Sequence, residues 1–507
     1  MKIIKKLINR FTLVSILLIF QIAWIAVVAT YMTSYHYTIS IIFTVFSMIV
    51  AASVINKQYD PEMKLAWIVP ILVFPLFGWA LYLLFGTKIA VRRLTHKFNR
   101  STSLTVKKLK QEQETLDELK ERQSSFYGIS KYLSDFSFPV YKNTAMKYYP
   151  LGDDMFPDLL EELKSAERFI FIEFFIISEG LVWNSVLEIL EEKVRAGVDV
   201  RVIYDDFGCI NYLSSKYYRV LEAKGIKCIA FNRYRPFLSV IMNNRDHRKI
   251  IVIDGQTAFT GGVNLADEYI NKKTRYGHWK DNAVMLKGDA VATFTTLFLE
   301  MWNWNRNSTD DTESLIACSK GSSDVSDGYI VPYGDSPLDS EIVGENIYLH
   351  IISNAKRYLY ITTPYLIINS SLTSALVLAA KRGVDVRIII PKIPDKRIVY
   401  QLTKSHCPPL LKAGVKIYDY TPGFMHAKSF VCDDKIATVG SINMDYRSLH
   451  LHFECGCLIY RCSIIPEIRK DFEETFDQCE PESTSTRKIG IIRNFYYALL
   501  RLVSPLF

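Results

Sequence analysis

Two stretches of the sequence are near copies: residues 245–264 read RDHRKIIVIDGQTAFTGGVN, and residues 424–443 read FMHAKSFVCDDKIATVGSIN. Both follow the pattern H-x-K-x4-D-x6-G-[GS]-x-N, and the second copy starts 179 positions after the first. One H-x-K alone is typical of an exposed strand. Core packing needs no such polar set, and burying an unpaired lysine is costly. The exact repetition therefore indicates one site to which both copies contribute.

The matched polar positions are the candidate site residues. Residues i and i+2 of a strand point to the same face, so each His lies beside its Lys. The Asp-Gly at 254–255 is typical of a tight hairpin turn, where the aspartates can serve local structure as well as chemistry. The candidate catalytic residues are His247, Lys249, Asp254, His426, Lys428 and Asp433. The candidate phosphate-binding residues are Asn264 and Asn443.

Two imidazoles at one centre suit in-line substitution at a phosphodiester. One attacks phosphorus, and the other protonates the departing alkoxide and later deprotonates the incoming hydroxyl. The lysines and asparagines are expected to neutralise the non-bridging oxygens, so neither a metal nor a cofactor is expected. Asp281 and Glu454 follow the two asparagines by 17 and 11 residues and are the candidates to orient the imidazoles. A surface role for these two carboxylates stays open.

The repeat extends well beyond the two motifs. AERFIFIEFFI (166–176) resembles AKRYLYITTPYLI (355–367), and AGVDVRVIYDD (196–206) resembles RGVDVRIIIPK (382–392). Strands and helices alternate throughout, which predicts an α/β fold built from a duplicated unit. We expect a first half over 140–304, a connecting loop over 305–328 and a second half over 329–480.

The N-terminal region, residues 1–90, is strongly apolar. No Asp, Glu, Lys or Arg occurs between Arg10 and Lys57, or between Lys64 and Lys88. A bilayer is crossed by ~20 apolar residues, which predicts spans near 11–32, 38–55 and 65–86. A cleaved signal peptide is a weaker interpretation of the first run. The third run contains prolines, and either a kinked span or a re-entrant segment fits it.

The distribution of Lys and Arg predicts on which side of the membrane the rest of the chain lies. Eight Lys/Arg lie between Lys88 and Lys110, against four in the first ten residues. With three spans the richer segment is cytoplasmic, and with it the catalytic portion. The segment 91–139 reads as a charged linker or helix. The tail 481–507 is basic and amphipathic, typical of an interfacial helix on anionic lipid or of a docked C-terminal helix. Nine scattered cysteines without a C-x-x-C pair agree with a reducing compartment.

The paired motifs resemble those of the phospholipase D superfamily. Within it, KLAWIVPILVFPLFGWALYLLFG (64–86), DHRKIIVIDGQTAFTGGVNLADEY (246–269) and GSINMDYRSLHLHFE (440–454) are similar to the bacterial cardiolipin synthases. The resemblance implies two phospholipase D-like halves forming one catalytic unit in the cell membrane. It implies that two phosphatidylglycerol molecules give cardiolipin and glycerol through a phosphohistidine. It favours His247 as the nucleophile and leaves the reverse assignment open. The additional run near 11–32 departs from many relatives.

Other functions share part of this pattern. A phospholipase D hydrolase, or a transferase using another alcohol, differs only in the nucleophile that attacks the phosphohistidine. In the hydrolase it is water, and in the transferase it is the other alcohol. A nucleic-acid phosphodiesterase fits the net charge of +8 but needs no membrane spans. A non-catalytic scaffold would not need both motif copies intact. The sequence leaves the oligomeric state open.

Overall fold

The structure is a computed structural model of the whole chain. It describes residues 19, 22–23, 26, 34–57, 60–86, 92–233, 243–308, 312–318, 326–339, 341–482 and 491–506. The chain divides into two compact units. One consists of residues 1–94, 234–244 and 489–507, and the other of residues 95–233 and 245–488. The second unit contains both motif copies.

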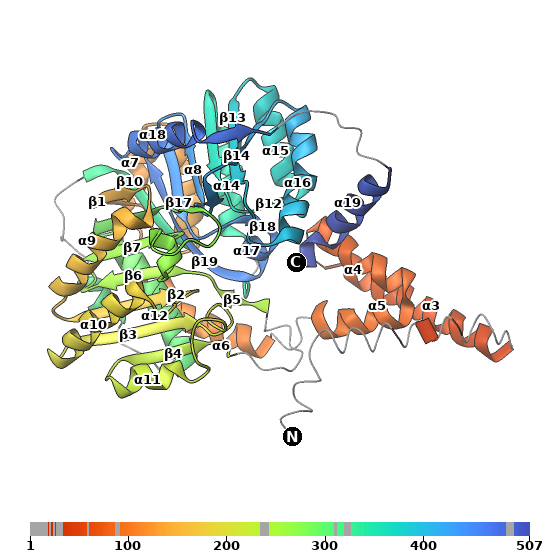
Figure 1. The fold of residues 1–507 in the computed structure, drawn as a ribbon, viewed down its shortest axis with the longest axis horizontal. Helices are drawn as coiled ribbons and strands as arrows, with labels where there is room; N and C mark the ends of the chain where they lie inside the picture. Colours follow the sequence, from red (N-terminus) through yellow and green to blue (C-terminus); the bar gives the residue numbers. More distant parts are fainter. Residues whose placement is uncertain are drawn as a thin grey trace. The chain divides into compact units, whose positions relative to one another are not determined.

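Strands and helices alternate along the first half of the second unit (Figure 1). Its elements are β1 (Tyr141–Tyr149), α9 (Gly152–Ser165), β2 (Phe169–Phe174), α10 (Leu181–Arg195), β3 (Asp199–Asp205), α11 (Tyr217–Ala223), β4 (Lys227–Phe231), β5 (Arg245–Asp246), β6 (Lys249–Ile253), β7 (Thr257–Gly261), η4 (Asp267–Ile270), β8 (His278–Lys280), β9 (Ala283–Gly288) and α12 (Val291–Arg306).

The second half repeats this order with small additions. Its elements are α13 (Thr312–Ala317), β10 (Ser326–Asp335), α14 (Val343–Asn354), β11 (Tyr358–Thr362), β12 (Leu366–Ile367), α15 (Ser370–Lys381), β13 (Asp385–Pro391), α16 (Arg397–Lys412), β14 (Lys416–Tyr420), β15 (Gly423–Met425), β16 (Ser429–Cys432), β17 (Ile436–Gly440), β18 (Met444–Asp445), α17 (Tyr446–His450), β19 (His452–Tyr460), α18 (Ile465–Phe476) and β20 (Cys479–Pro481).

Sixteen of the described strands form one mixed sheet that runs through both halves. Its first half has the order β1-β9-β7-β6-β2-β3-β4, and its second half has the matching order β10-β19-β17-β16-β11-β13-β14. The halves meet where β1 pairs with β10 in antiparallel fashion, with Tyr141 opposite Ile330. The predicted duplication is therefore confirmed as two α/β halves of the same topology related by an approximate twofold axis.

The continuous apolar runs of the sequence become strands that are buried on both faces. All six residues of β2 are buried. Ile170 and Ile172 join the cluster of apolar side chains that includes residues of α9 and α10. Phe171 faces the other way, and its ring stacks on Phe298 of α12 at 4.5 Å. Helices therefore cover the first-half sheet on both sides.

Residues 95–139, within the segment expected to be a charged linker or helix, belong to the second unit and are largely helical. They form α6 (Arg92–Leu104), η2 (Val106–Lys108), α7 (Gln113–Glu121) and α8 (Ser125–Asp135). Phe98 is 2% exposed, and its ring lies 5.1 Å from that of Trp304 and 5.3 Å from that of Phe453. The sequence is charged, but its apolar residues at helical spacing give each helix one buried face.

The connecting segment also differs from the expected loop over 305–328. The helix α12 continues to Arg306, α13 occupies Thr312–Ala317, and β10 begins at Ser326. Near the end of α12, Trp302 and Trp304 are buried, and Trp304 packs on Phe231 of β4 and Phe453 of β19.

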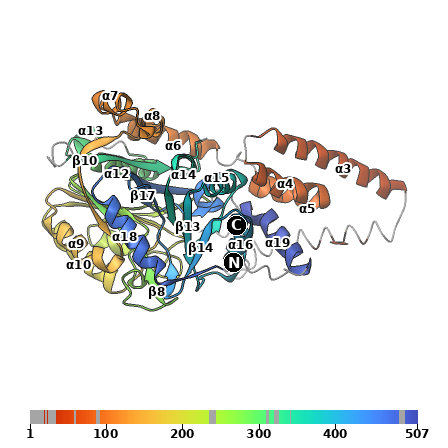
Figure 2. The same cartoon turned by 90° about the horizontal axis from the view of Figure 1, so that it is seen from above.

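The N-terminal unit is a small helical assembly by itself. It contains α3 (Ser34–Ile55), α4 (Pro61–Val73), α5 (Pro75–Leu81), η1 (Tyr82–Gly86), α19 (Ile491–Val503) and η5 (Ser504–Leu506). In Figure 2, α3, α4 and α5 lie side by side, and Val54, Trp67 and Ile71 form their small core. The helix α19 packs on α4 and leaves Phe495, 65% exposed, on its outer side.

One helix in the described chain, over Tyr37–Ile55, is long and apolar enough to cross a membrane. It corresponds to the predicted span 38–55. The predicted span 11–32 lies almost wholly outside the described residues. The predicted span 65–86 is not one continuous helix, because α4 ends at Val73, two residues before Pro75, and a π-helical turn follows α5. Proline at 75 cannot donate a backbone hydrogen bond to continue α4.

Candidate active site

The paired histidines lie at equivalent places in the two halves. His247 follows the short strand β5 and precedes β6, and His426 follows β15 and precedes β16. Both imidazoles are buried, with 6% and 8% of their residues exposed. The lysine two positions after each is also buried. Four side chains that can carry positive charge therefore occupy the interior of this unit.

Short parallel strand pairs join each histidine to the opposite half. In β5 and β19, Arg245 is opposite His452 and Asp246 is opposite Phe453. This register brings His247 level with Glu454, and the His247 amide donates to the Phe453 carbonyl at 2.9 Å. In β15 and β8, Met425 is opposite Lys280, which brings His426 level with Asp281.

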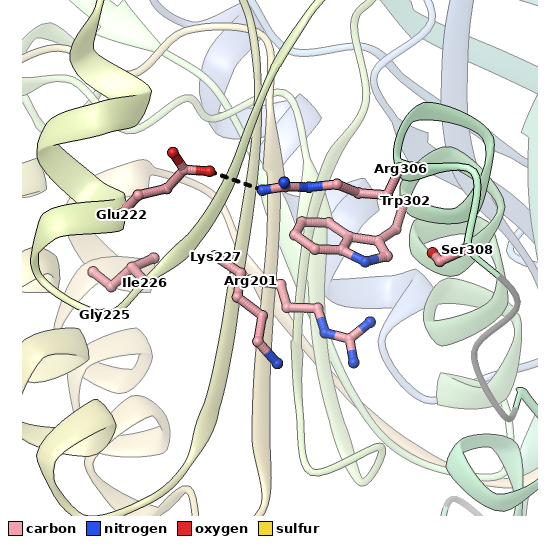
Figure 3. A pocket seen from close by; sticks show the side chains of 8 residues that line it. All are labelled: Arg201, Glu222, Gly225, Ile226, Lys227, Trp302, Arg306 and Ser308. Atoms are coloured by element: carbon pink, nitrogen blue, oxygen red, sulfur yellow. Dashed lines mark hydrogen bonds and ion pairs between the residues drawn. The ribbon is translucent and has the colours of Figure 1, made fainter.

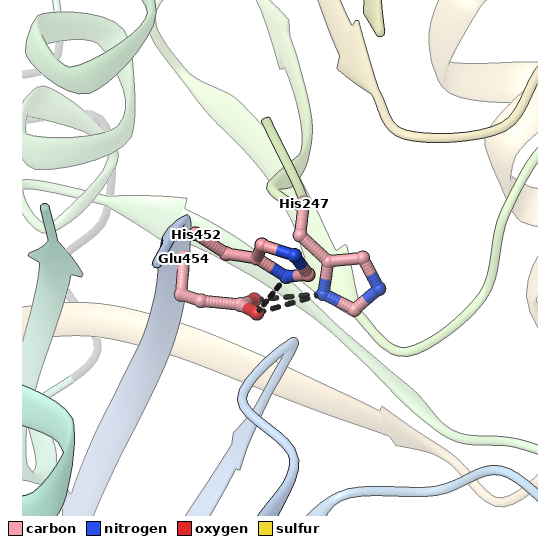
Figure 4. Close-up of side chains that lie close together, drawn as sticks. All are labelled: His247, His452 and Glu454. Carbon is pink, nitrogen blue, oxygen red and sulfur yellow. Dashed lines mark hydrogen bonds and ion pairs between the residues drawn. The ribbon is translucent and has the colours of Figure 1, made fainter. Parts of the chain in front are cut away.

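Each imidazole is hydrogen-bonded to a carboxylate of the other half. Nδ1 of His247 lies 2.9 Å from both oxygens of Glu454 (Figure 4). Nδ1 of His426 lies 2.5 Å from Oδ2 of Asp281. Because Nδ1 is engaged in both rings, Nε2 is the nitrogen left for a reacting group. Both candidate orienting carboxylates therefore lie beside a histidine, and each carboxylate comes from the half that does not contain that histidine.

The lysines are held against the backbone of the histidines. Nζ of Lys249 donates to the His247 carbonyl at 2.7 Å. Nζ of Lys428 donates to the His426 carbonyl and lies 2.8 Å from Nδ1 of the same residue. Neither ammonium forms a direct ion pair with a carboxylate among the described residues, so both remain available to an anion.

Burial and mutual repulsion lower the proton affinities in the site. Burial, and then the charges of Lys249, Lys428 and His426, hold the pKa of His247 well below its usual value. Burial lowers the pKa of His426 to about 4, Lys428 adds to the decrease, and Asp281 acts against it through its charge and hydrogen bond. Burial also lowers the pKa of Lys428 to about 7.

Small residues at the end of the motif make room for the carboxylates. A Cβ on Gly262 would lie 1.9 Å from Oδ1 of Asp281, so no larger residue fits there. The equivalent Ser441 donates its hydroxyl to Oε2 of Glu454 at 2.5 Å. Ser448 donates to the other oxygen of Glu454 at 2.7 Å. The two motif copies therefore differ at this position because they face different carboxylates: Gly262 leaves room for Asp281, and Ser441 donates a hydrogen bond to Glu454.

The two asparagines have different surroundings. Asn264 accepts from the Ile176 amide at 3.1 Å and donates to the Tyr269 hydroxyl at 2.7 Å. The side-chain oxygen of Asn443 is buried and has no hydrogen-bond partner among the described residues. Asn264 is thus partly committed to positioning loops, whereas Asn443 retains free hydrogen-bonding capacity.

The structure does not bring Asp254 and Asp433 to the imidazoles. Asp254 sits in the β6–β7 turn and accepts the amides of residues 167, 168 and 169 at 2.7, 2.8 and 2.8 Å. Asp433 does the same for residues 356, 357 and 358 at 2.8 to 2.9 Å. Each carboxylate satisfies the free amides where the neighbouring strand begins. These contacts hold the turn and the strand start together, which is the local structural role that the position of both aspartates in hairpin turns allows.

Two aromatic neighbours of the histidines were not part of the expected site. Trp279, two residues before Asp281, packs on His426 with ring centroids 5.4 Å apart. His452, two residues before Glu454, packs on His247 at the same distance. Alternation along a strand was the available signal, since a residue two positions before an orienting carboxylate shares its face.

A cavity of about 480 Å³ lies elsewhere, beside β3, β4 and α12 (Figure 3). Its cations are already paired, because Arg201 and Lys227 both bond to Asp199 and Arg306 bonds to Glu222. The second half repeats the first of these groups with Asp385, Arg387 and Lys416. The ion pairs of Asp199 link the neighbouring strands β3 and β4, and the lining of the cavity contains no residue of either motif copy, so this cavity is not the site of the chemistry.

Comparison with known proteins agrees with this geometry. A family described as "Cardiolipin synthase, PLD-like domain" matches residues 159–302 and 348–476, and one described as "Phospholipase_D-nuclease N-terminal" matches residues 45–86. A cardiolipin synthase of Alkalihalophilus pseudofirmus is 33% identical, over 92% of this chain and 94% of the relative. An uncharacterized protein of Streptococcus mutans is 45% identical, over 89% of this chain and 98% of the relative.

The fold is also found in a solved structure. The crystal structure of a phosphatidylserine synthase of Haemophilus influenzae superposes with a TM-score of 0.54, covering 73% of this chain and 97% of that chain at 13% identity. That likeness concerns the fold alone. The matched family covers more than half of the chain, in both halves of the duplicated sheet. The chain therefore belongs to the cardiolipin synthase family with a phospholipase D-like domain.

Proposed function

We propose that this chain is a cardiolipin synthase that transfers a phosphatidyl group from one phosphatidylglycerol to the free glycerol hydroxyl of another, releasing glycerol. The observation that carries the proposal is the pair of buried imidazoles, each hydrogen-bonded through Nδ1 to a carboxylate of the opposite half. Relatives that carry the name cardiolipin synthase support the choice of lipid substrate.

In the first half-reaction, Nε2 of His247 attacks phosphorus, and the bond from phosphorus to the glycerol oxygen breaks. His426, as imidazolium, gives the Nε2 proton to that oxygen. The surroundings support this assignment. Burial lowers the pKa of both imidazoles, but at His426 the charge and the hydrogen bond of Asp281 oppose the decrease, whereas at His247 the neighbouring cations add to it. A bound phosphodiester adds a negative charge, which favours the protonated state of His426.

In the second half-reaction, neutral His426 takes the proton from the hydroxyl of the acceptor phosphatidylglycerol. The acceptor oxygen attacks phosphorus, the N–P bond to His247 breaks, and cardiolipin is released. One phosphodiester replaces another, so the exchange needs no nucleotide. Lys249, Lys428 and Asn443 contact the non-bridging oxygens and stabilise the charge that develops on them.

The chain acts at the cell membrane, where its substrates reside. The apolar helix over Tyr37–Ile55 spans the bilayer, the sequence adds a predicted span over 11–32, and the helices broken at Pro75 within 65–86 form a kinked span, so that the catalytic unit lies on the cytoplasmic side. Exposed apolar residues along α3, including Ile42 at 60% and Ile49 at 61%, support a lipid environment for this helix. The exposed apolar face of α19 supports contact with the lipid interface.

The direct test is the analysis of lipid products from purified protein given phosphatidylglycerol alone. We expect cardiolipin and glycerol in equal amounts, without nucleotide and in the presence of chelator. Phosphatidic acid and glycerol as the sole products would identify a hydrolase instead. Activity that is lost with EDTA and restored by a divalent ion would contradict the metal-free mechanism.

The roles of the histidines are tested by trapping the intermediate with a p-nitrophenyl phosphodiester, whose leaving group needs no proton. The His426→Ala variant should acquire the mass of a phosphatidyl group and then stall, because its nucleophile remains. The His247→Ala variant should acquire none. The opposite pattern would reverse the assignment, and adducts on neither variant would refute the covalent route.

A further inference from the structure

His452 is a buried histidine beside the active site that the proposed reaction does not use. It is 8% exposed, and neither ring nitrogen has a hydrogen-bond partner among the described residues. Its Nδ1 lies 3.5 Å from Oε1 of Glu454, which is too long for a well-formed hydrogen bond. A buried imidazole with only this long contact is incompletely hydrogen-bonded, so a ligand for its nitrogen would stabilise it.

The donor atoms around it form a compact cluster. One atom each of His247, His452 and Glu454 lie within 4.8 Å of one another. Figure 4 shows both rings turned toward the same carboxylate. A tetrahedral ion with bonds of about 2 Å holds its ligand atoms about 3.3 Å apart, so small side-chain rotations would bring the three donors onto one ion.

Packing alone does not account for an imidazole at this position. The two halves place equivalent rings against their histidines, with centroids 5.4 Å apart and interplanar angles of 43° for His452 and 48° for Trp279. In the first half the ring is an indole, which has no acceptor nitrogen. The aromatic contact therefore needs only a ring, as Trp279 shows. His452 adds to this contact a nitrogen that can bind a metal, and it does so beside His247 and not beside His426.

We propose that His247, His452 and Glu454 form a binding site for Zn²⁺ or a divalent transition metal of similar preference for imidazole and carboxylate ligands. Two histidines and one glutamate are a ligand set typical of zinc, with a fourth position left for water. The ion would engage Nδ1 of His247 in place of its hydrogen bond to Glu454. It would therefore inhibit the enzyme reversibly, and this consequence rests on the function proposed above.

The site is tested by calorimetric titration of the chelator-stripped full-length protein in detergent with Zn²⁺. We expect about one tightly bound ion per chain, and at least about tenfold weaker binding in His452→Asn. His452→Trp, which copies the ring of the first half, should behave in the same way. Equal affinity in the wild type and His452→Asn would overturn the proposal, as would the absence of tight binding in the wild type.

Two further measurements separate the site from the reaction. Co²⁺ should give the visible absorption of a tetrahedral site in the wild type and not in His452→Asn; identical spectra would contradict the ligand assignment. Zn²⁺ should slow phosphatidyl transfer in the wild type but not in His452→Asn, when each rate is compared with that of the same variant without metal. Binding that depends on His452 without any inhibition would uphold the metal site and count against the catalytic role of His247.

Discussion

At the scale of single residues, the site concentrates positive charge where no fixed anion balances it completely. His247, Lys249, His426 and Lys428 are buried together; burial lowers the pKa of each, and neighbouring cations add to the decrease at His247, His426 and Lys428. Two carboxylates engage the imidazoles, yet neither lysine has one within ion-pair distance among the described residues. Such an arrangement favours a bound phosphodiester, because the anion relieves the repulsion that the empty site carries.

The pKa of Lys428 gives the site a pH dependence. Burial lowers this pKa to about 7, so the ammonium is present below that pH and is lost as the pH rises through it. We expect kcat/KM for phosphatidylglycerol in mixed micelles to fall on the alkaline side. Lys428→Arg keeps its charge at all these pH values, so its alkaline limb should move to higher pH although its maximum is lower. An unchanged limb would show that another group sets it.

Asp254 is predicted to affect stability more than chemistry. Its carboxylate accepts three strand-start amides, and its backbone has φ 53°, which Asn tolerates and Ala does not. Asp254→Ala should lower the free energy of unfolding by about 1–3 kcal/mol, and Asp254→Asn by less. Denaturant melts measure the effect. If Asp254→Asn instead loses activity as completely as His247→Ala with normal stability, Asp254 acts in the chemistry and not mainly in holding the turn.

At the scale of elements, two short parallel pairings decide the geometry of the chemistry. The pair β5–β19 sets His247 against Glu454, and the pair β8–β15 sets His426 against Asp281. Each pairing involves only two or three residues from each strand. A shift of one residue in either would turn the carboxylate away from its imidazole, since side chains alternate between faces.

Gly423 in β15 offers a test of this dependence. A Cβ at this position would lie 2.2 Å from the His278 carbonyl oxygen and 2.3 Å from its amide nitrogen in β8. Gly423→Ala should therefore separate the two strands, weaken the His426–Asp281 contact and reduce kcat at least about tenfold.

The matched control is Gly128→Ala in α8, where a Cβ would meet nothing within 4 Å. Alanine in a helix is more stable than glycine by about 0.5–1 kcal/mol, so this variant should keep its activity and melt slightly higher. Full activity in Gly423→Ala would show that the β8–β15 pairing does not position His426.

At the scale of the whole molecule, the active site belongs to neither half alone. Each half supplies one H-x-K and the carboxylate for the other half's histidine, and one sheet joins them through β1 and β10. The duplication is therefore a requirement of the site and not simply a larger scaffold. The duplication also supplies the site with two chemically similar imidazoles, one from each half.

The membrane topology predicted from charge can be tested with two cysteine variants. The partly exposed Cys318 and Cys479 are first replaced by serine, since the other cysteines are buried. Lys164→Cys, on α9 of the catalytic unit, should react with a membrane-impermeant maleimide only after the cells are opened. Lys57→Cys, between the predicted spans, should react in intact cells. Labelling of Lys164→Cys in intact cells would overturn the cytoplasmic assignment.

The sequence by itself determined the chemistry that the chain can carry. The repeated H-x-K motifs, their shared spacing and the matching strand segments were sufficient to predict a duplicated α/β fold. They also located His247, Lys249, His426 and Lys428 as the candidate site. These features are local: periodicity of 2 along a strand and fixed spacing within a hairpin are visible in any short window. Asp281 and Glu454 were found for the same reason, since each follows its motif closely.

Only the tertiary structure decided how these residues pair. Glu454 lies 207 positions from His247, and Asp281 lies 145 from His426, so no local pattern could reveal that the carboxylates cross between the halves. Strand pairing at such separation depends on how both halves pack. The same packing turned Asp254 and Asp433 toward strand-start amides and placed His452 beside His247, because the free hydrogen-bonding groups and the space at each position exist only in the folded chain.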